Sequence, residues 1–212
     1  MAEINIDTTK LENLSKVMKK APPEITQKAL PAAVNRTLTT VNTQMKKEIT
    51  TRYKIKKSDI SGGKKYKSES SNNLITVKKA SSKNPSGQLT VRGSTLTLSR
   101  FLQGQKTPVS HKGKTMKAIK RLKSPKVQVK RGGVKSVNRA FVQRSKGATG
   151  IFVRDQNNKL RMLRTLSVAQ MAGNKEVLKI AEQTAIDTLE KRMEHEIEYR
   201  LNKMAGDLSG NT

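Results

Sequence analysis

The sequence predicts an α+β fold in which a small antiparallel sheet is flanked by two long amphipathic helices. Apolar residues recur at helical spacing in residues 24–52 and 175–205, and they alternate in short runs between these segments. With 212 residues, the chain can form one domain with a modest core. We therefore expect a single domain over residues 1–206 with a long basic loop at about 102–125, followed by a flexible tail at 207–212.

The N-terminal segment is predicted to form a short strand and then a helix. Residues 2–7 alternate between apolar and polar side chains, as a strand does. The motif TKLE at 9–12 is a capping box that begins a helix, and the prolines at 22 and 23 end it near residue 20. The apolar residues of this helix are Leu11, Leu14, Val17 and Met18.

The first long helix is predicted over residues 24–52. Pro31 should kink or restart it, because proline has no N–H to donate and its ring clashes with the preceding turn. Beyond Pro31 the apolar residues follow steps of three and four, which places them on one face and predicts a helix packed on a sheet. These residues are Val34, Leu38, Val41, Met45 and Ile49.

The middle of the chain is predicted to hold short strands. Residues 88–92 and 95–99 flank Gly93 and Ser94, which favours a tight hairpin. Residues 102–125 are rich in Lys, Gly and Ser and predict a long loop, with one short helical turn at 116–122. The other strands are expected at 74–78, 126–131, 140–144, 150–154 and 159–164, the last closing a hairpin through Asn157 and Asn158. We expect a half-buried antiparallel sheet whose exposed face carries Lys and Arg.

A short helix and then the second long helix are predicted at the C-terminal end. The short helix covers residues 167–171, Asn174 caps the long helix, and Gly206 ends it. Acid-before-base pairs Asp187–Lys191 and Glu196–Arg200 support the long helix weakly. Its expected buried stripe consists of Leu178, Ala181, Ala185, Leu189, Met193, Ile197, Leu201 and Met204.

Positive charge is concentrated in the middle of the chain. The whole chain has a net charge of +28, and residues 52–164 hold 30 Lys and Arg against three Asp and Glu, a net of +27. Such a block faces a polyanion, an acidic protein partner or water, and its self-repulsion favours the first two. The candidate contacts to DNA or an acidic partner are Lys112, Lys114, Lys117, Lys120, Arg121, Lys123, Lys126, Lys130, Arg131, Arg139 and Arg144.

Any nucleic-acid contact is expected to be independent of base sequence. Aromatic residues make up only 3% of the chain, and we expect Phe141 and Phe152 to be buried in strands rather than exposed for base stacking. The chain has no zinc-finger spacing, no basic region joined to heptads and no aromatic RNA-binding strand motif. Lys and Arg would then act on phosphates alone.

We expect neither an enzyme nor a cofactor or metal site. The histidines, His111 and His195, have no partner at catalytic or zinc spacing. The acids of the basic block, Asp59, Glu69 and Asp155, are isolated from one another, although a metal-dependent nuclease would need several brought together. The chain has no cysteine, no secretory signal at its start and no apolar stretch long enough for a membrane span, so we expect no membrane partner.

Three stretches taken together resemble the minor tail protein Z family of tailed bacteriophages and prophages. The first, residues 29–60, contains VNRT at 34–37 and RYKIKKSDI at 52–60. The second is RAFV at 139–142 followed by GIFVR at 150–154. The third is QMAGN at 170–174 with EKRMEHEI at 190–197. The likeness covers most of the chain in order, and it is weakest in the loop at 102–125.

The resemblance implies a virion component of long non-contractile tails, made in the host cytoplasm and incorporated into the tail. It implies a role in tail completion at the head-proximal end, where head and tail connect, and in placing the DNA end. Its expected partners are other tail or neck proteins, such as the tail terminator or the tail tube, and genomic DNA, with the chain forming a homo-oligomeric ring. It implies no catalytic residues. The alternative is a free, sequence-independent nucleic-acid-binding protein.

Overall fold

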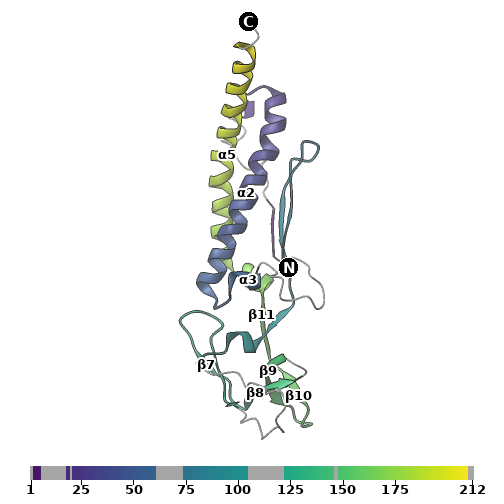
Figure 1. The fold of residues 1–212 in the computed structure, drawn as a ribbon, viewed down its shortest axis with the longest axis vertical. Helices are drawn as coiled ribbons and strands as arrows, with labels where there is room; N and C mark the ends of the chain where they lie inside the picture. The colour runs from purple at the N-terminus through teal and green to yellow at the C-terminus, as the bar shows by residue number, and fades with distance from the viewer. Residues whose placement is uncertain are drawn as a thin grey trace, which may run out of the picture.

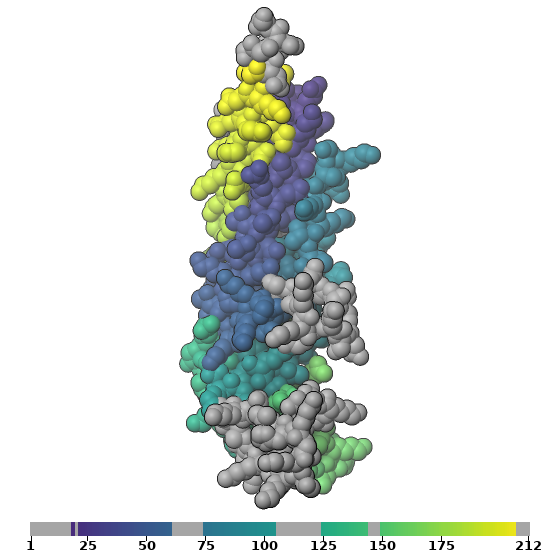
Figure 2. Space-filling model, viewed as in Figure 1, coloured from purple at the N-terminus to yellow at the C-terminus, as the bar shows by residue number. Residues whose placement is uncertain are grey.

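The computed structural model describes residues 2–5, 18–19, 21–60, 74–104, 122–145 and 148–209. The molecule is elongated (Figure 1), with two long helices and a hairpin side by side at one end and β8, β9 and β10 at the other. The space-filling view shows the same rod-like outline (Figure 2). The α+β class and the two long helices are therefore confirmed. However, the helices pack against each other instead of flanking one sheet, and the described strands form four separate antiparallel sheets.

Helix α2 (Pro23–Arg52) is the first long helix. Proline at its start, Glu24 in the first turn and Arg52 in the last turn all suit helix ends. Of the predicted kink or restart at Pro31, the restart is wrong, because one helix continues through this residue. The predicted apolar stripe is confirmed, since Val34, Leu38, Val41, Met45 and Ile49 are all fully buried.

Helix α5 (Lys175–Ser209) packs antiparallel along α2. Its start is capped as predicted, because the Asn174 side chain accepts a hydrogen bond from the Glu176 N–H at 3.0 Å. Gly206 does not end it, so the predicted boundary at 206 falls inside the helix. The predicted buried stripe is wrong at its C-terminal end, where Leu201 and Met204 are 39% and 51% exposed. Its buried residues include Val177, Ala181, Ala185, Leu189, Met193 and Ile197.

A buried carboxylate lies between the two long helices. Glu196 is only 5% exposed, and it forms ion pairs with Arg36 of α2 at 3.1 Å and with Arg200 of α5 at 3.3 Å. The predicted Glu196–Arg200 pair is therefore confirmed. Asp187 instead accepts a hydrogen bond from Gln183 at 2.8 Å, and the ion pairs of the described residues do not include Asp187–Lys191.

A three-stranded antiparallel sheet lies along α2. It consists of β1 (Ala2–Asn5), β3 (Gln88–Val91) and β2 (Ile75–Lys78), with β3 in the centre. These strands confirm three of the predicted runs. The helix predicted at 9–20 lies outside the described residues, apart from Met18 and Lys19, which are helical.

The hairpin formed by β2 and β3 is held tightly against α2. The Asn35 side chain donates to the Ala80 carbonyl at 3.0 Å and accepts from the Ala80 N–H at 2.8 Å. A Cβ at Gly87 would lie 2.6 Å from Leu38 Cδ1, so only glycine allows this approach. Asn35 therefore satisfies both backbone polar groups of a buried residue in the connection between the strands.

The predicted hairpin through Gly93 and Ser94 is wrong. Strand β4 (Thr95–Thr97) pairs with β11 (Arg164–Ser167), and a 3₁₀ turn, η2 (Leu98–Phe101), follows β4. The physical reason is that both edges of β3 are already paired, one with β1 and the other with β2, so no edge is left for β4.

The four-stranded sheet lies at the far end from the helices. Its order is β10 (Leu160–Met162), β9 (Ala148–Arg154), β8 (Ala140–Ser145) and β5 (Leu122–Lys123). The predicted strands at 140–144 and 150–154 are confirmed, while the strand predicted at 159–164 is confirmed only over residues 160–162 because Arg164 already belongs to β11. Asn158 adopts the expected left-handed conformation in the turn before β10 (φ 59°). Leu122 forms a strand instead of the predicted helical turn, whose other residues lie outside the described part of the chain.

A further strand pair is shorter than predicted. The strand expected at 126–131 is reduced to β6 (Lys126–Val127), which pairs with β7 (Lys135–Ser136). Beyond β6, the chain pairs with the end of α2 through an isolated bridge between Lys130 and Tyr53. Two short helices, α3 (Lys57–Ile60) and α4 (Val168–Ala172), complete the described elements, and α4 begins with the Ser167–Gln170 capping box.

The prediction of a Lys and Arg face on the four-stranded sheet is wrong for its described side chains. One face holds the buried Val142 and Ile151. The other holds Phe141 and Phe152, whose ring centroids lie 6.4 Å apart. Phe152 is buried as predicted, while Phe141 is half-buried. Apolar residues thus occupy both faces of β8 and β9, and the described arginines of this sheet, Arg154 and Arg161, lie at the end of β9 and on the edge strand β10.

We expect Asn35→Leu to lower the free energy of unfolding by about 1–3 kcal/mol, because it leaves the N–H and carbonyl of Ala80 without partners. Urea unfolding measures the change. The matched control is Thr39→Ala, one turn along α2, where the exposed hydroxyl bonds only to its own helix. The control should stay within about 0.5 kcal/mol of the wild type. Equal effects of the two substitutions would contradict this role of Asn35.

Candidate polyanion-binding surface

The basic residues of the middle segment gather outside the two long helices. Between the end of α2 and the start of α4, the described residues include 19 Lys and Arg, against only Asp59 and Asp155. These residues belong to the sheet end of the molecule and to the hairpin beside α2 (Figure 1). The charge segregation of the sequence therefore becomes a spatial one, with most of these cations at the sheet end and the lysines of the hairpin beside α2.

The chain leaving α2 runs beside the segment that follows β6. The Lys54 N–H donates to the Val129 carbonyl at 2.9 Å, and the Arg131 N–H donates to the Arg52 carbonyl at 2.8 Å. Tyr53 and Ile55 are buried, so the alternating Lys54 and Lys56 side chains are exposed.

Backbone and side-chain contacts bring the lysines of these two segments together. Lys54 donates a side-chain hydrogen bond to Gln103, and the Gln103 N–H donates to the Lys126 carbonyl at 2.9 Å. Val127, next to Lys126, pairs with Lys135 on β7. We call the resulting group of exposed lysines the basic edge: Lys54, Lys56, Lys57, Lys126, Lys130 and Lys135.

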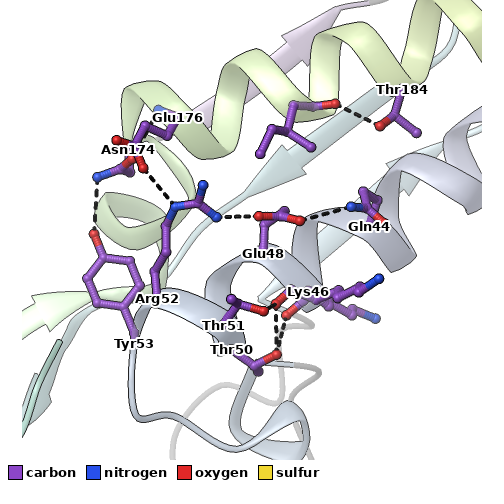
Figure 3. Close-up of polar contacts among 12 residues, drawn as sticks. Gln44, Lys46, Glu48, Thr50, Thr51, Arg52, Tyr53, Asn174, Glu176 and Thr184 are labelled. Atoms are coloured by element: carbon purple, nitrogen blue, oxygen red, sulfur yellow. Dashed lines mark hydrogen bonds and ion pairs between the residues drawn. The ribbon is translucent and has the colours of Figure 1, made fainter. Parts of the chain in front are cut away.

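Arg52 joins the long helices instead of facing a ligand (Figure 3). Its Nε donates to Glu176 of α5 at 3.0 Å, and its guanidinium also pairs with Glu48 of α2. Glu48 in turn accepts a hydrogen bond from Gln44 at 2.9 Å. The hydrogen bonds to Glu48 and then to Glu176 raise the pKa of the Arg52 guanidinium above its ordinary value. This arginine is therefore occupied at the junction between the helices and the basic edge.

Arg131, one of the predicted contacts, also has a structural partner. Its Nε donates to the Thr50 carbonyl at 2.9 Å, in the last turn of α2. A cation at this position satisfies a carbonyl that the helix leaves free and interacts favourably with the negative end of the helix dipole. We therefore leave Arg131 out of the basic edge.

The structure brings together only part of the predicted contact set. Lys126 and Lys130 join the basic edge, while Arg139 is exposed in the turn before β8 with φ at 58°. The side chains of Lys123 and Arg144 are not among those described. Five further candidates lie outside the described residues: Lys112, Lys114, Lys117, Lys120 and Arg121.

The contacts predicted from the sequence do not include Lys54, Lys56, Lys57 and Lys135. The alternation of Tyr53 and Ile55 with Lys54 and Lys56 was a signal that could have placed the first two on an exposed face. For Lys135 the sequence carried no comparable signal, because its position depends on the pairing of β6 with β7.

The described carboxylates of the basic block have structural partners. Asp59 pairs with Arg100 at 3.9 Å. Asp155 accepts the Lys159 N–H at 2.8 Å and so supports the turn before β10. Glu69 and His111 lie outside the described residues, and His195 is exposed on α5. Within the part of the chain that the structure describes, no three His, Cys, Asp or Glu residues converge as metal ligands do.

Comparison with protein-family models, with curated protein sequences and with solved structures gives no match to this chain. None of the described helices combines the length and the apolar character that crossing a membrane requires.

We expect Arg131→Ala to lower the free energy of unfolding by about 1 kcal/mol, because the last turn of α2 loses a charged hydrogen-bond donor. Lys130→Ala is the matched control: it removes the same charge one residue earlier, at an exposed side chain, and should change stability by less than about 0.5 kcal/mol. Thermal and urea unfolding of both variants measure the difference. If the two variants are equally stable, Arg131 does not stabilise this helix end.

Proposed function

We propose that the protein is a structural component of a bacteriophage tail or neck that acts in tail completion at the head-proximal end. In this proposal, the long helices provide the scaffold and the protein contacts. The sheet end faces DNA in the channel or an acidic surface of a neighbouring tail protein. The observation that carries the proposal is the basic edge, which lies at the end of α2 in a region almost free of acids.

The chemistry of the basic edge suits phosphates better than bases. Exposed lysines act as point charges that neutralise phosphates and release counterions, which gives affinity without reading sequence. The aromatic residues nearby are not available for stacking, since Tyr53 and Phe101 are buried. This supports a partner recognised by its charge, and duplex DNA is the partner that we propose.

The separation of charge along the rod supports a role in an assembly. A homo-oligomeric ring would place the basic edges of all copies near one another, where their potentials add and attract a DNA end. The helical ends would remain available for contacts with tail proteins such as the tail terminator or the tail tube. The sequence likeness to the minor tail protein Z family supports the same location.

DNA affinity should depend on the basic edge. We expect the isolated protein to bind duplex DNA with an affinity that falls steeply between about 50 and 200 mM salt. Replacing Lys126, Lys130 and Lys135 with Gln should lower the slope of log K against log[salt] by about 2–3, since each phosphate contact contributes roughly 0.9. Fluorescence anisotropy with two unrelated DNA sequences measures both slopes and tests for sequence dependence.

The matched control replaces three exposed lysines of α5, Lys179, Lys191 and Lys203, with Gln. This variant has the same net charge as the basic-edge variant, so it should keep the wild-type slope. A slope that falls equally in both variants would show that net charge, and not the basic edge, determines binding.

Assembly separates the proposed function from the alternative of a free nucleic-acid-binding protein. A tail component should co-purify with tails, and Lys126→Glu, Lys130→Glu and Lys135→Glu together should reduce DNA-filled, infectious particles while tails still assemble. Electron microscopy, DNA content and infectivity measure this. A protein that is absent from purified tails, or a charge-reversed variant with full infectivity, would rule out the proposed role.

A further inference from the structure

Helix α5 packs on one side of α2, and the β2–β3 hairpin packs on another. Two adjacent residues of α2 show that these two contacts lie at the same level along its axis. Asn35 binds Ala80 in the connection between β2 and β3. The next residue, Arg36, binds Glu196 of α5. Figure 1 agrees with these contacts, since α2 lies between α5 and the hairpin that contains β2 and β3. The outer surfaces of α5 and the hairpin therefore face opposite sides of the rod at the same level.

The outer surface of α5 at this level is mainly acidic, with four acids against the exposed Lys191 on the same face. Residues 187, 190, 194 and 198 follow helical spacing and share one face. The buried residues Leu189, Met193 and Ile197 lie toward α2, so this face points away from α2. We call its acids the acidic row: Asp187, Glu190, Glu194 and Glu198. None of them belongs to an ion pair among the described residues.

The outer surface of the hairpin at this level is basic. Lys78, Lys79 and Lys83 are exposed around Ala80, and we call them the hairpin lysines. Residues 74–104 contain no Asp or Glu, and the hairpin lysines take part in none of the ion pairs of the described residues. Strand β2 is also an edge strand, and Val77 on it is 37% exposed.

We propose that the acidic row of one copy docks on the hairpin lysines of a second copy. The two surfaces are opposite in charge and lie at the same height. Glu194 and Glu198 flank the level of Glu196, and Lys79 lies next to Ala80.

The position of the two surfaces also sets the type of assembly. Because the surfaces differ, the contact is heterologous: each copy uses its acidic row on one neighbour and its hairpin lysines on the other. Because both surfaces lie at one height, successive copies stand side by side with no shift along the rod. A repeated contact without such a shift closes into a ring when each copy is also rotated about the rod axis relative to its neighbour, and all basic edges then lie at the same end. This inference specifies the interface of the ring in the proposed function and rests on that part of it.

A charge-exchange experiment with DNA-free protein tests the interface. Sedimentation velocity should show that the wild type forms oligomers at low salt and dissociates at high salt. The row variant combines Glu190→Lys, Glu194→Lys and Glu198→Lys, and the hairpin variant combines Lys78→Glu, Lys79→Glu and Lys83→Glu. Each variant alone should self-associate at least about tenfold more weakly, because like charges then face each other.

Mixing the two variants should restore assembly. The lysine-bearing α5 of the row variant then meets the acidic hairpin of the other, and the two unchanged surfaces also meet. Restoration requires both variants to be folded, so it rules out misfolding as the cause of the loss. A mixture that stays monomeric, or a wild type that is monomeric at low salt, would overturn the proposal.

The basic edge provides a control that separates this inference from DNA binding. The variant with Lys126→Glu, Lys130→Glu and Lys135→Glu has the same charge change as the hairpin variant and should assemble like the wild type. If it loses assembly to the same degree, the interface is not at the hairpin lysines. If mixing the charge-exchanged variants restores assembly but neither the wild type nor any variant binds DNA, the interface is supported and the polyanion-binding role is ruled out.

Discussion

The burial of α2 on two sides is the constraint on which the rest of the structure depends. Its apolar stripe is fully buried, and Ala29 and Ala33 add to the buried surface. An α-helix with one buried stripe needs one covering layer, whereas α2 has two, because α5 covers one side and β3 the other. Asn35 and Arg36 add one polar contact to each layer. Without α2, α5 would lose most of its packing surface.

The C-terminal end of α2 is where the helical scaffold meets the charged surface. Arg52 and Tyr53 contact the start of α5, through Glu176 and Asn174 respectively. Immediately afterwards the chain pairs with residues around Lys130, and its lysines point outward while Tyr53 and Ile55 point inward. Residues 52–56 thus connect the two ends of the molecule and also expose lysines of the basic edge. The stability of the fold and the exposure of these lysines therefore depend on the same junction.

Periodicity predicted the local elements well and their partners poorly. The stripe in α2, the Asn174 cap of α5 and the turn at Asn158 were all correct, because each depends on residues within a few positions of one another. The β3–β4 hairpin was wrong because β1 occupies the edge that β4 would need. The stripe of α5 was wrong at Leu201 and Met204, because helical spacing does not say where the covering element ends. The basic face of the four-stranded sheet was wrong because Phe141 and Phe152 occupy it.

The sequence by itself determined the segregation of charge and the two amphipathic helices, since both follow from the order of residue types along the chain. Only the tertiary structure decided which cations are free. Arg52 and Arg131 lie in the same basic block as Lys126 and Lys130, but their guanidiniums are bound to Glu48, Glu176 and Thr50. It also placed the acidic row and the hairpin lysines at one height on opposite sides of α2. The physical reason is that these partners are distant in sequence, and packing against α2 brings them to their positions.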